Sequence, residues 1–142
     1  MRIREADARD VPAVRALLAE LGYADDLPRV AGRVEELGRD SASLLLVAEG
    51  DGAIVGLASA TTIPLLHEEG RWCRLSALVV TEGRRRGGAG RRLVEEIEAR
   101  ARAQGCRYLE VTSGERPERA AAHALYEALG LEQVSRRYLK EL

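Results

Sequence analysis

The chain has 142 residues, 46% of them hydrophobic, and its 22 basic residues nearly balance its 23 acidic ones, for a net charge of −1. This length suits one domain spanning residues 1–142, and no apolar run approaches the roughly 18 residues that a membrane-spanning helix needs. The near-zero charge excludes strong long-range attraction to nucleic acid, and the first ten residues are too polar for a secretion signal, so we expect a cytoplasmic protein with no nucleic-acid or membrane partner.

Periodicity and turn residues predict an alternation of strands and helices along the whole chain. In chain order the predicted elements are a strand at 1–5, helices at 11–21 and 27–37, strands at 43–49, 53–62 and 72–80, a helix at 88–104, a strand at 107–112, a helix at 117–129, and a closing strand or hairpin at 131–142. No repeat or long linker divides the chain. The order β-α-α-β-β-β-α-β-α-β predicts a single α/β domain with a mixed sheet.

Capping and turn residues set several of these boundaries. Asp7 or Asp10 precedes the first helix as a cap, and Gly22 ends that helix. The sequence Gly50-Asp51-Gly52 between two strand-like runs is typical of a tight hairpin turn.

The segment Thr81–Leu93, TEGRRRGGAGRRL, places a glycine-rich turn between a strand and a helix. The first N–H groups of a helix lack partners and carry the positive end of its dipole, so they can bind a phosphate that approaches closely. Glycines permit that approach, and arginines add charge at the rim. No Lys followed by Ser or Thr is present, as a P-loop requires, and the Rossmann spacing fails. The alternative is a solvated, flexible turn.

Within this segment, Arg85-Arg86-Gly87-Gly88-Ala89-Gly90 fits the pattern [QR]xxGx[GA] and resembles the acetyl-coenzyme A signature of the GNAT N-acetyltransferase superfamily. The preceding strand end Leu78-Val79-Val80, the strand Tyr108–Val111 and the segment His123–Gly130, similar to [AN]xx[FL]Yxxx[GL], extend the resemblance over nearly the whole chain. The resemblance implies the GNAT fold, a mixed and mostly antiparallel sheet with helices on both faces. It also implies a bulge that separates the two central strands.

The resemblance further implies how acetyl-coenzyme A binds. The backbone groups of Leu78 and Val80 would pair with the pantetheine arm as an added strand does. The amides from Arg86 to Arg91 would hold the pyrophosphate. The cofactor-binding residues implied are Leu78, Val79, Val80, Arg85, Arg86, Gly87, Gly88, Ala89, Gly90 and Arg91.

The catalytic residues implied are Tyr126 and Glu110. Tyr126 stands where the family's general acid lies, and a phenol with a pKa near ~10 can protonate a departing thiolate; the alternative is a ring that only fills the core. Glu110 would activate the amine through water, or would simply pair with an arginine. The Val80 amide would stabilise the oxyanion.

The implied reaction is direct attack of a primary amine of a small molecule on acetyl-coenzyme A in a ternary complex. Within the superfamily the chain is loosely similar to aminoalkylphosphonate N-acetyltransferases. Alternatives are N-terminal acetylation of a protein or peptide, and a non-catalytic acyl-coenzyme A sensor, which the lack of a carboxylate in residues 74–77 favours. Asp25 and Asp26 could hold a cationic amine or cap the second helix. The family also suggests a homodimer.

Side chains that could bind a metal form no metal-site pattern. Cys73 and Cys106 lack metal-site spacing and predict reduced thiols, and His67-Glu68-Glu69 predicts a solvated hairpin tip. We therefore expect no metal. His123 lies one helical turn before Tyr126, where it could approach the thiol or simply pack.

Overall fold

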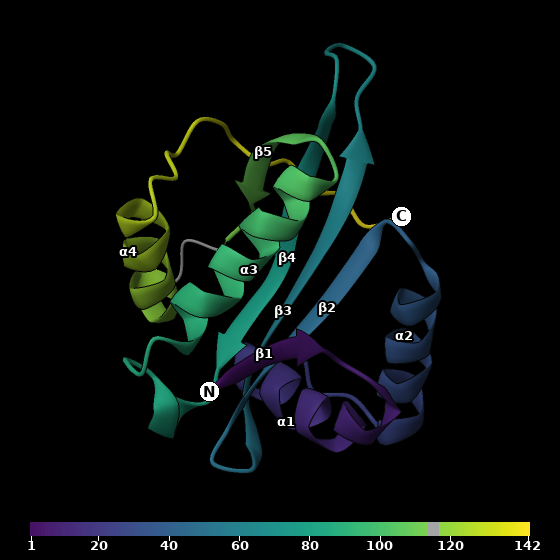
Figure 1. Ribbon diagram of the computed structural model, residues 1–142, viewed down its shortest axis with the longest axis vertical. Helices are drawn as coiled ribbons and strands as arrows, with labels where there is room; N and C mark the ends of the chain where they lie inside the picture. Colours follow the sequence, from purple (N-terminus) through teal and green to yellow (C-terminus); the bar gives the residue numbers. More distant parts are fainter. Residues whose placement is uncertain (114–116) are drawn as a thin grey trace. The chain divides into compact units, whose positions relative to one another are not determined.

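The computed structural model describes residues 1–113 and 117–142, in two compact units, Met1–Val111 and Thr112–Leu142 (Figure 1). In chain order the elements of the first unit are β1 (Arg2–Glu5), α1 (Val11–Leu21), α2 (Leu27–Arg39), β2 (Ser43–Gly50), β3 (Ala53–Pro64), β4 (Arg71–Val80), α3 (Ala89–Ala103) and β5 (Cys106–Val111). The second unit holds α4 (Ala120–Ala128). None of the helices described has the length and apolar character that crossing a membrane requires.

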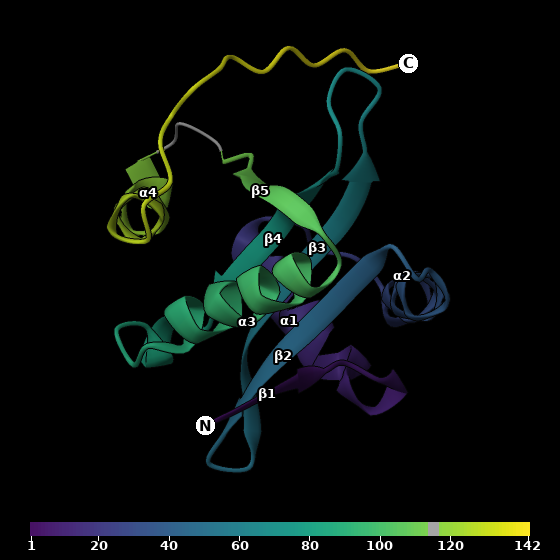
Figure 2. The same ribbon diagram turned by 45° about the horizontal axis from the view of Figure 1, so that its top comes forward.

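The first unit is built on one five-stranded sheet in the order β1-β2-β3-β4-β5 (Figure 2). The first four strands are antiparallel neighbours and β5 runs parallel to β4, so the mixed, mostly antiparallel α/β sheet is confirmed. The β2–β3 turn places Asp51 at φ 52° and Gly52 at φ 76°. Two left-handed residues in a row are what a type I′ hairpin needs.

Helices cover both faces of this sheet. On one face α1 and α2 bury a cluster with the sheet residues Val47, Leu57 and Val79. On the other face α3 packs with residues such as Leu93, which is fully buried. A Cβ on Gly56 would lie 3.3 Å from Leu93 Cδ1 and 3.1 Å from the Val79 carbonyl oxygen, so glycine at this position lets α3 approach the sheet closely.

Capping differs in detail from the sequence prediction. Asp7 accepts from the Arg9 N–H and caps a short 3₁₀ turn, Ala8–Asp10, that leads into α1. The Asp10 carboxylate accepts in return from the Asp7 N–H, and Asp10 precedes α1 without capping it through its side chain. Helix α2 runs to Arg39, two residues beyond the predicted end. Asp40 ends it and accepts hydrogen bonds from the Ala42 N–H and the Ser43 hydroxyl.

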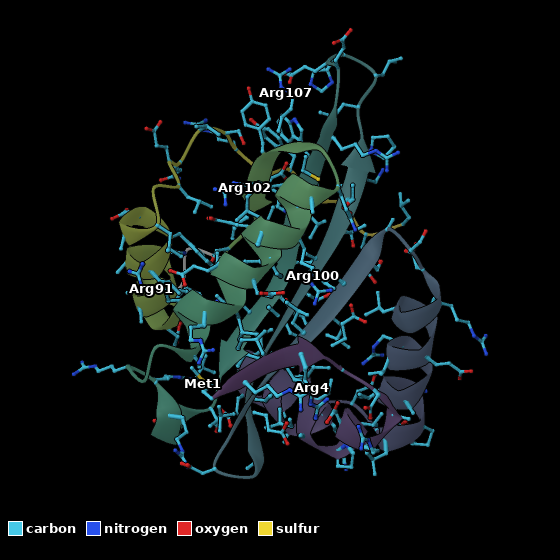
Figure 3. All side chains as sticks on the ribbon, viewed as in Figure 1. Met1, Arg4, Arg91, Arg100, Arg102 and Arg107 are labelled. Atoms are coloured by element: carbon cyan, nitrogen blue, oxygen red, sulfur yellow. The ribbon has the colours of Figure 1, made fainter. Side chains whose placement is uncertain are left out.

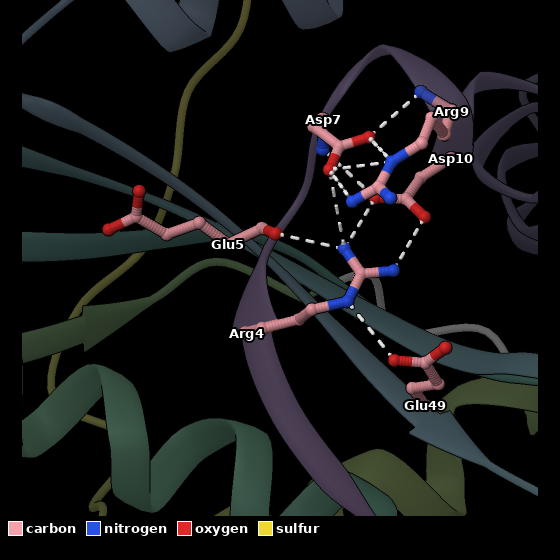
Figure 4. Close-up of polar contacts among 6 residues, drawn as sticks. All are labelled: Arg4, Glu5, Asp7, Arg9, Asp10 and Glu49. Atoms are coloured by element: carbon pink, nitrogen blue, oxygen red, sulfur yellow. Dashed lines mark hydrogen bonds and ion pairs between the residues drawn. The ribbon is translucent and has the colours of Figure 1, made fainter.

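Arg4 ties β1 to the start of α1 and to β2 (Figure 4). Its guanidinium donates two bonds of 2.8 Å to the buried Asp10 carboxylate and one of 3.1 Å to Glu49. These bonds raise the pKa of Arg4 and lower that of Asp10. These bonds connect β1 with the start of α1 and with β2, which is a structural role.

The predicted closing strand is wrong for the structure described: residues 131–142 contain no strand. In the second unit Gly130 adopts φ 85° and the Leu131 N–H donates to the Tyr126 carbonyl, which ends α4. Val134, Tyr138 and Leu139 are each more than 80% exposed. An alternating pattern becomes a strand only by pairing with a neighbour, and this segment has none within its unit.

Candidate functional site

Strand β4 is paired on both sides over only half of its length. Its pairing with β5 runs from Arg71 to Leu75 and stops there, whereas its pairing with β3 continues to Val80. Within the first unit as described, no strand lies on the β5 side of Ser76–Val80, a stretch that we call the open edge.

A β-bulge marks the point where the open edge begins. Ser59 of β3 is opposite Ala77, whereas Ala60 is opposite Leu75, so Ser76 is the extra residue. The Ser76 hydroxyl donates to the Ser59 carbonyl at 3.2 Å. A bulge bends its strand and increases the local twist, which carries β4 away from β5. The bulge that the resemblance implied is therefore present, although nothing in the sequence singles out Ser76.

Backbone direction decides which groups the open edge presents. The Thr81 N–H donates to the Val55 carbonyl on β3 at 2.8 Å. Because backbone groups alternate along a strand, Val79 also faces β3, and Leu78 and Val80 direct their N–H and C=O groups to the open edge. These are the two residues that the sequence predicts for pairing with a pantetheine arm. An unpaired edge of this kind accepts an added strand.

The glycine–arginine loop, residues 81–91, connects the open edge to α3. Gly88 precedes α3 in a left-handed conformation, φ 83°, and among the described residues no side-chain cap bond is present there. The first N–H groups of α3 therefore lack helical partners and point at the loop with the positive end of the dipole. A Cβ on Gly87 would be 3.3 Å from the Arg84 carbonyl, so the turn is tight there. Arg86 is also left-handed, at φ 72°.

The loop arginines differ in their contacts. Arg84 donates to Asp51 of the β2–β3 turn at 2.7 Å, and Arg85 Nε donates to the Val80 carbonyl at 3.1 Å. Arg91, at the start of α3 (Figure 3), forms a 3.8 Å ion pair with Glu95 one turn away. Arg86 is exposed. Arg86 and Arg91 thus carry positive charge near the first turn of α3, and their described contacts with the protein are weak. Such arginines could bind a phosphate ligand.

An acidic residue on α1 accepts hydrogen bonds from the start of this loop. Glu20 accepts a hydrogen bond from the Thr81 hydroxyl at 2.7 Å and one from the Glu82 N–H at 3.1 Å. Arg85 lies 4.0 Å from the same carboxylate. Sequence reasoning missed Glu20, because it precedes the loop by about sixty residues and only the packing of α1 beside the end of β4 brings them together.

The predicted base Glu110 lies on β5 directly opposite Arg74 of β4. Arg74 Nε donates to Glu110 Oε1 at 3.0 Å. This is the arginine pairing that the sequence left open as the alternative. The guanidinium occupies one of the lone-pair sites of the carboxylate, which leaves the other sites to accept a proton.

The predicted acid Tyr126 lies on α4 in the second unit. Burial raises the pKa of its phenol, and the positive charge of Arg119 partly opposes that shift. A raised pKa keeps the phenol protonated at neutral pH, as a proton donor requires. His123, on the same helix, is 3.0 Å from the Ser113 hydroxyl, so that ring already has a partner within the unit.

Other candidate residues have structural contacts. Asp26 caps α2 by accepting from the Arg29 N–H, and Asp25 pairs with Arg33 at 2.9 Å. Burial raises the pKa of the Cys73 thiol to about 11, so it is protonated at neutral pH. His67 is exposed at the β3–β4 hairpin. In the described parts of the chain, no three His, Cys, Asp or Glu side chains group as a metal site would need.

Comparison with known proteins adds independent information. Residues 11–131 match the family model described as "Acetyltransferase (GNAT) family". A solved structure of a transcriptional regulator from Bacillus halodurans is 25% identical, with a TM-score of 0.87 over 99% of this chain and 98% of that chain. No curated protein matches by sequence.

Two enzymes of known structure share the fold at lower identity. A ribosomal-protein-alanine N-acetyltransferase from Brucella melitensis is 22% identical, with a TM-score of 0.81 over the full length of both chains, 100% of each. An aminoglycoside N-acetyltransferase, solved in complex with coenzyme A, is 20% identical, with a TM-score of 0.85 over 99% of this chain and 93% of that chain.

Proposed function

The chain belongs to the GNAT acetyltransferase family, and we propose that it transfers the acetyl group of acetyl-coenzyme A to a primary amine of a small molecule. The observation that carries the proposal is the continuity of the open edge with the glycine–arginine loop. The proposal takes residues 1–142 as one N-acetyltransferase domain, since the family match runs through both compact units.

The residues present suit an acyl-coenzyme A. Leu78 and Val80 offer an unpaired strand edge for the amides of a pantetheine arm, and the partnerless N–H groups at the start of α3 offer a cradle for a pyrophosphate. When bound, acetyl-coenzyme A supplies the thioester carbonyl. The Arg85 contact with the Val80 carbonyl must break before an arm can pair there.

The chemistry asked of the protein is modest. The amine nitrogen forms a bond to the carbonyl carbon, the carbon–sulfur bond breaks, and one proton moves from the amine to the departing sulfur. In our proposal the Val80 N–H donates to the developing oxyanion and the Tyr126 phenol donates to sulfur. Glu110 is the proposed acceptor of the amine proton through water. An amine that arrives already neutral would depend on Glu110 less than one that arrives protonated.

A second candidate is a non-catalytic acyl-coenzyme A sensor. The shortage of a free carboxylate near β4 favours the sensor. Residues 74–77 contain no carboxylate, and the neighbouring Glu110 accepts a hydrogen bond from Arg74. A sensor would need the open edge and the loop but no proton transfer.

The test is a thiol-release assay with acetyl-coenzyme A and a panel of polyamines, aminoalkylphosphonates, amino acids, aminoglycosides and peptides. We expect turnover with one class of small amines. Turnover with peptides alone would indicate that the acceptor is a protein or peptide N-terminus and not a small molecule. Tight coenzyme A binding without any turnover would favour the sensor. Absence of coenzyme A binding in calorimetry would overturn both functions.

Replacing Tyr126 by Phe tests the proposed acid separately. We expect turnover to fall at least tenfold, with the dissociation constant of coenzyme A unchanged within twofold, because only the hydroxyl is removed. Tyr138→Phe, in the exposed C-terminal segment, is the matched control. Unchanged turnover in Tyr126→Phe would remove this residue from the mechanism.

A further inference from the structure

Glu20 makes contacts that no role proposed above requires. It is the penultimate residue of α1, yet both oxygens of its carboxylate are directed to the start of the glycine–arginine loop. Oε1 accepts from the Thr81 hydroxyl at 2.7 Å, and Oε2 accepts from the Glu82 N–H at 3.1 Å. Holding both oxygens on one distant turn costs this side chain conformational entropy.

The same carboxylate also lies near the residue that contacts the open edge. Arg85 lies 4.0 Å from Glu20 Oε2 and donates through Nε to the Val80 carbonyl. Glu20 therefore contacts the loop at Thr81 and Glu82, where β4 ends, and at Arg85, where the signature begins. Arg84, bound to Asp51, also connects the loop with a distant element.

We propose that Glu20 is a positioning residue of the coenzyme A site, an inference that rests on the proposed function. By fixing Thr81, Glu82 and Arg85, Glu20 sets the path of the chain from the open edge to Gly88. The N–H groups of the first turn of α3 then have a fixed position before a ligand arrives. Preorganised donors bind an anion more tightly than donors that must be ordered on binding.

The electrostatic effect of Glu20 has the opposite sign, which makes the proposal easy to test. A carboxylate beside a pyrophosphate site repels the ligand, so removing the charge would by itself tighten binding. If Glu20 positions the loop, its removal should instead weaken coenzyme A binding. The direction of the change therefore separates the two effects.

The experiment measures coenzyme A binding and turnover in Glu20→Ala and Glu20→Gln. We expect the dissociation constant of coenzyme A and the KM of acetyl-coenzyme A to rise at least fivefold in Glu20→Ala, with kcat unchanged within twofold. Glu20→Gln keeps one acceptor oxygen, so its dissociation constant and KM should lie between those of Glu20→Ala and those of the parent. S-acetyl-pantetheine has no pyrophosphate, so its kcat/KM should stay within twofold in both variants.

Thr81 provides a test from the other side of the hydrogen bond. Thr81→Val should reproduce part of the loss, Thr81→Ser should restore affinity, and Glu20→Ala combined with Thr81→Val should be no worse than Glu20→Ala alone. Glu36→Ala, on an exposed face of α2, is the matched charge control and should bind coenzyme A like the parent. Thermal unfolding of each variant confirms that binding is measured on folded protein.

Two results would overturn the proposal. If the parent binds coenzyme A and Glu20→Ala or Thr81→Val binds it equally well or more tightly, the contacts of Glu20 do not position the loop, and the proposed function stands. An equal loss with S-acetyl-pantetheine would likewise assign Glu20 to general folding. If the parent itself binds no coenzyme A, the proposed function fails and this inference fails with it.

Discussion

The two halves of β4 have different surroundings. From Arg71 to Leu75 the strand lies between β3 and β5, whereas from Ser76 to Val80 it is paired with β3 alone. Leu75 is 1% exposed in the closed half. Val80 is only half-buried and carries the backbone groups proposed to meet a ligand.

One extra residue produces this difference. The bulge lies at Ser76. Before it, β4 forms backbone hydrogen bonds with strands on both sides, and after it β4 pairs on one side only. Stability should therefore depend on the closed half, and function on the backbone of the open half.

The largest expected effect is on stability and comes from the closed half. Leu75→Ala should lower the free energy of unfolding by about 3 kcal/mol, because it empties a fully buried site. Coenzyme A affinity, measured at a temperature where the variant is folded, should change less than twofold. Urea denaturation and calorimetry give the two values, and a large loss of affinity would show that the halves are not separable.

The next effect tests the open half through its backbone. Val80→Pro removes an N–H directed at the open edge and should lower kcat about a hundredfold, as loss of an oxyanion donor does. Its stability should fall less than that of Val79→Pro, which removes an N–H directed at β3. If Val79→Pro proves the more stable of the two, the assignment of backbone directions is wrong.

Acid offers a third test, because it acts through a group remote from both halves. Arg4 lowers the pKa of Asp10 in the folded state, so this carboxylate stabilises the fold fully above its unfolded pKa of about 3.9. That stability is lost as the pH falls through the lower folded value. Asp10→Asn should be about 2 kcal/mol less stable at pH 7 and should lose less on acidification.

Urea titrations from pH 7 to pH 3 measure this dependence. Coenzyme A affinity at pH 7 should be the same in Asp10→Asn and the parent, because neither half of β4 contacts the Arg4 cluster among the hydrogen bonds described. A pH dependence identical in variant and parent would assign acid sensitivity to other carboxylates.

The smallest expected effect concerns the bulge itself. Ser76→Ala removes the hydroxyl bond to the Ser59 carbonyl and should cost about 1 kcal/mol of stability. Coenzyme A affinity should change less than twofold, because the extra backbone residue, not the hydroxyl, makes the bulge. A tenfold loss of affinity would mean that the side chain keeps the edge open.

Local signals predicted much of this molecule. Gly22, Gly105 and Gly130 end helices at positive φ as expected, and the turn at Asp51 and Gly52 joins β2 to β3. Asp26 caps α2, one of the two roles that the sequence left open. These features depend on residues near in sequence, where φ preference and side-chain capping dominate.

Features that depend on distant partners were predicted poorly. The pattern at 131–142 suggested a strand, but strand formation needs a neighbour that the pattern does not supply. The pairing of Glu110 with Arg74 became evident only from the strand register, which places the two residues opposite each other. The proposed roles of Tyr126, Glu110 and the loop residues remain predictions, to be tested by the assays above.

The amino-acid sequence alone determined the family, the alternation of elements and the position of the glycine–arginine loop, because periodicity, turn residues and a short motif are local properties. Only the tertiary structure decided where β4 parts from β5, which backbone groups are left unpaired, and that Glu20 reaches Thr81 and Glu82. Those are contacts between segments far apart in the chain. Their geometry follows from how α1 and the strands pack together, and no short stretch of residues encodes it.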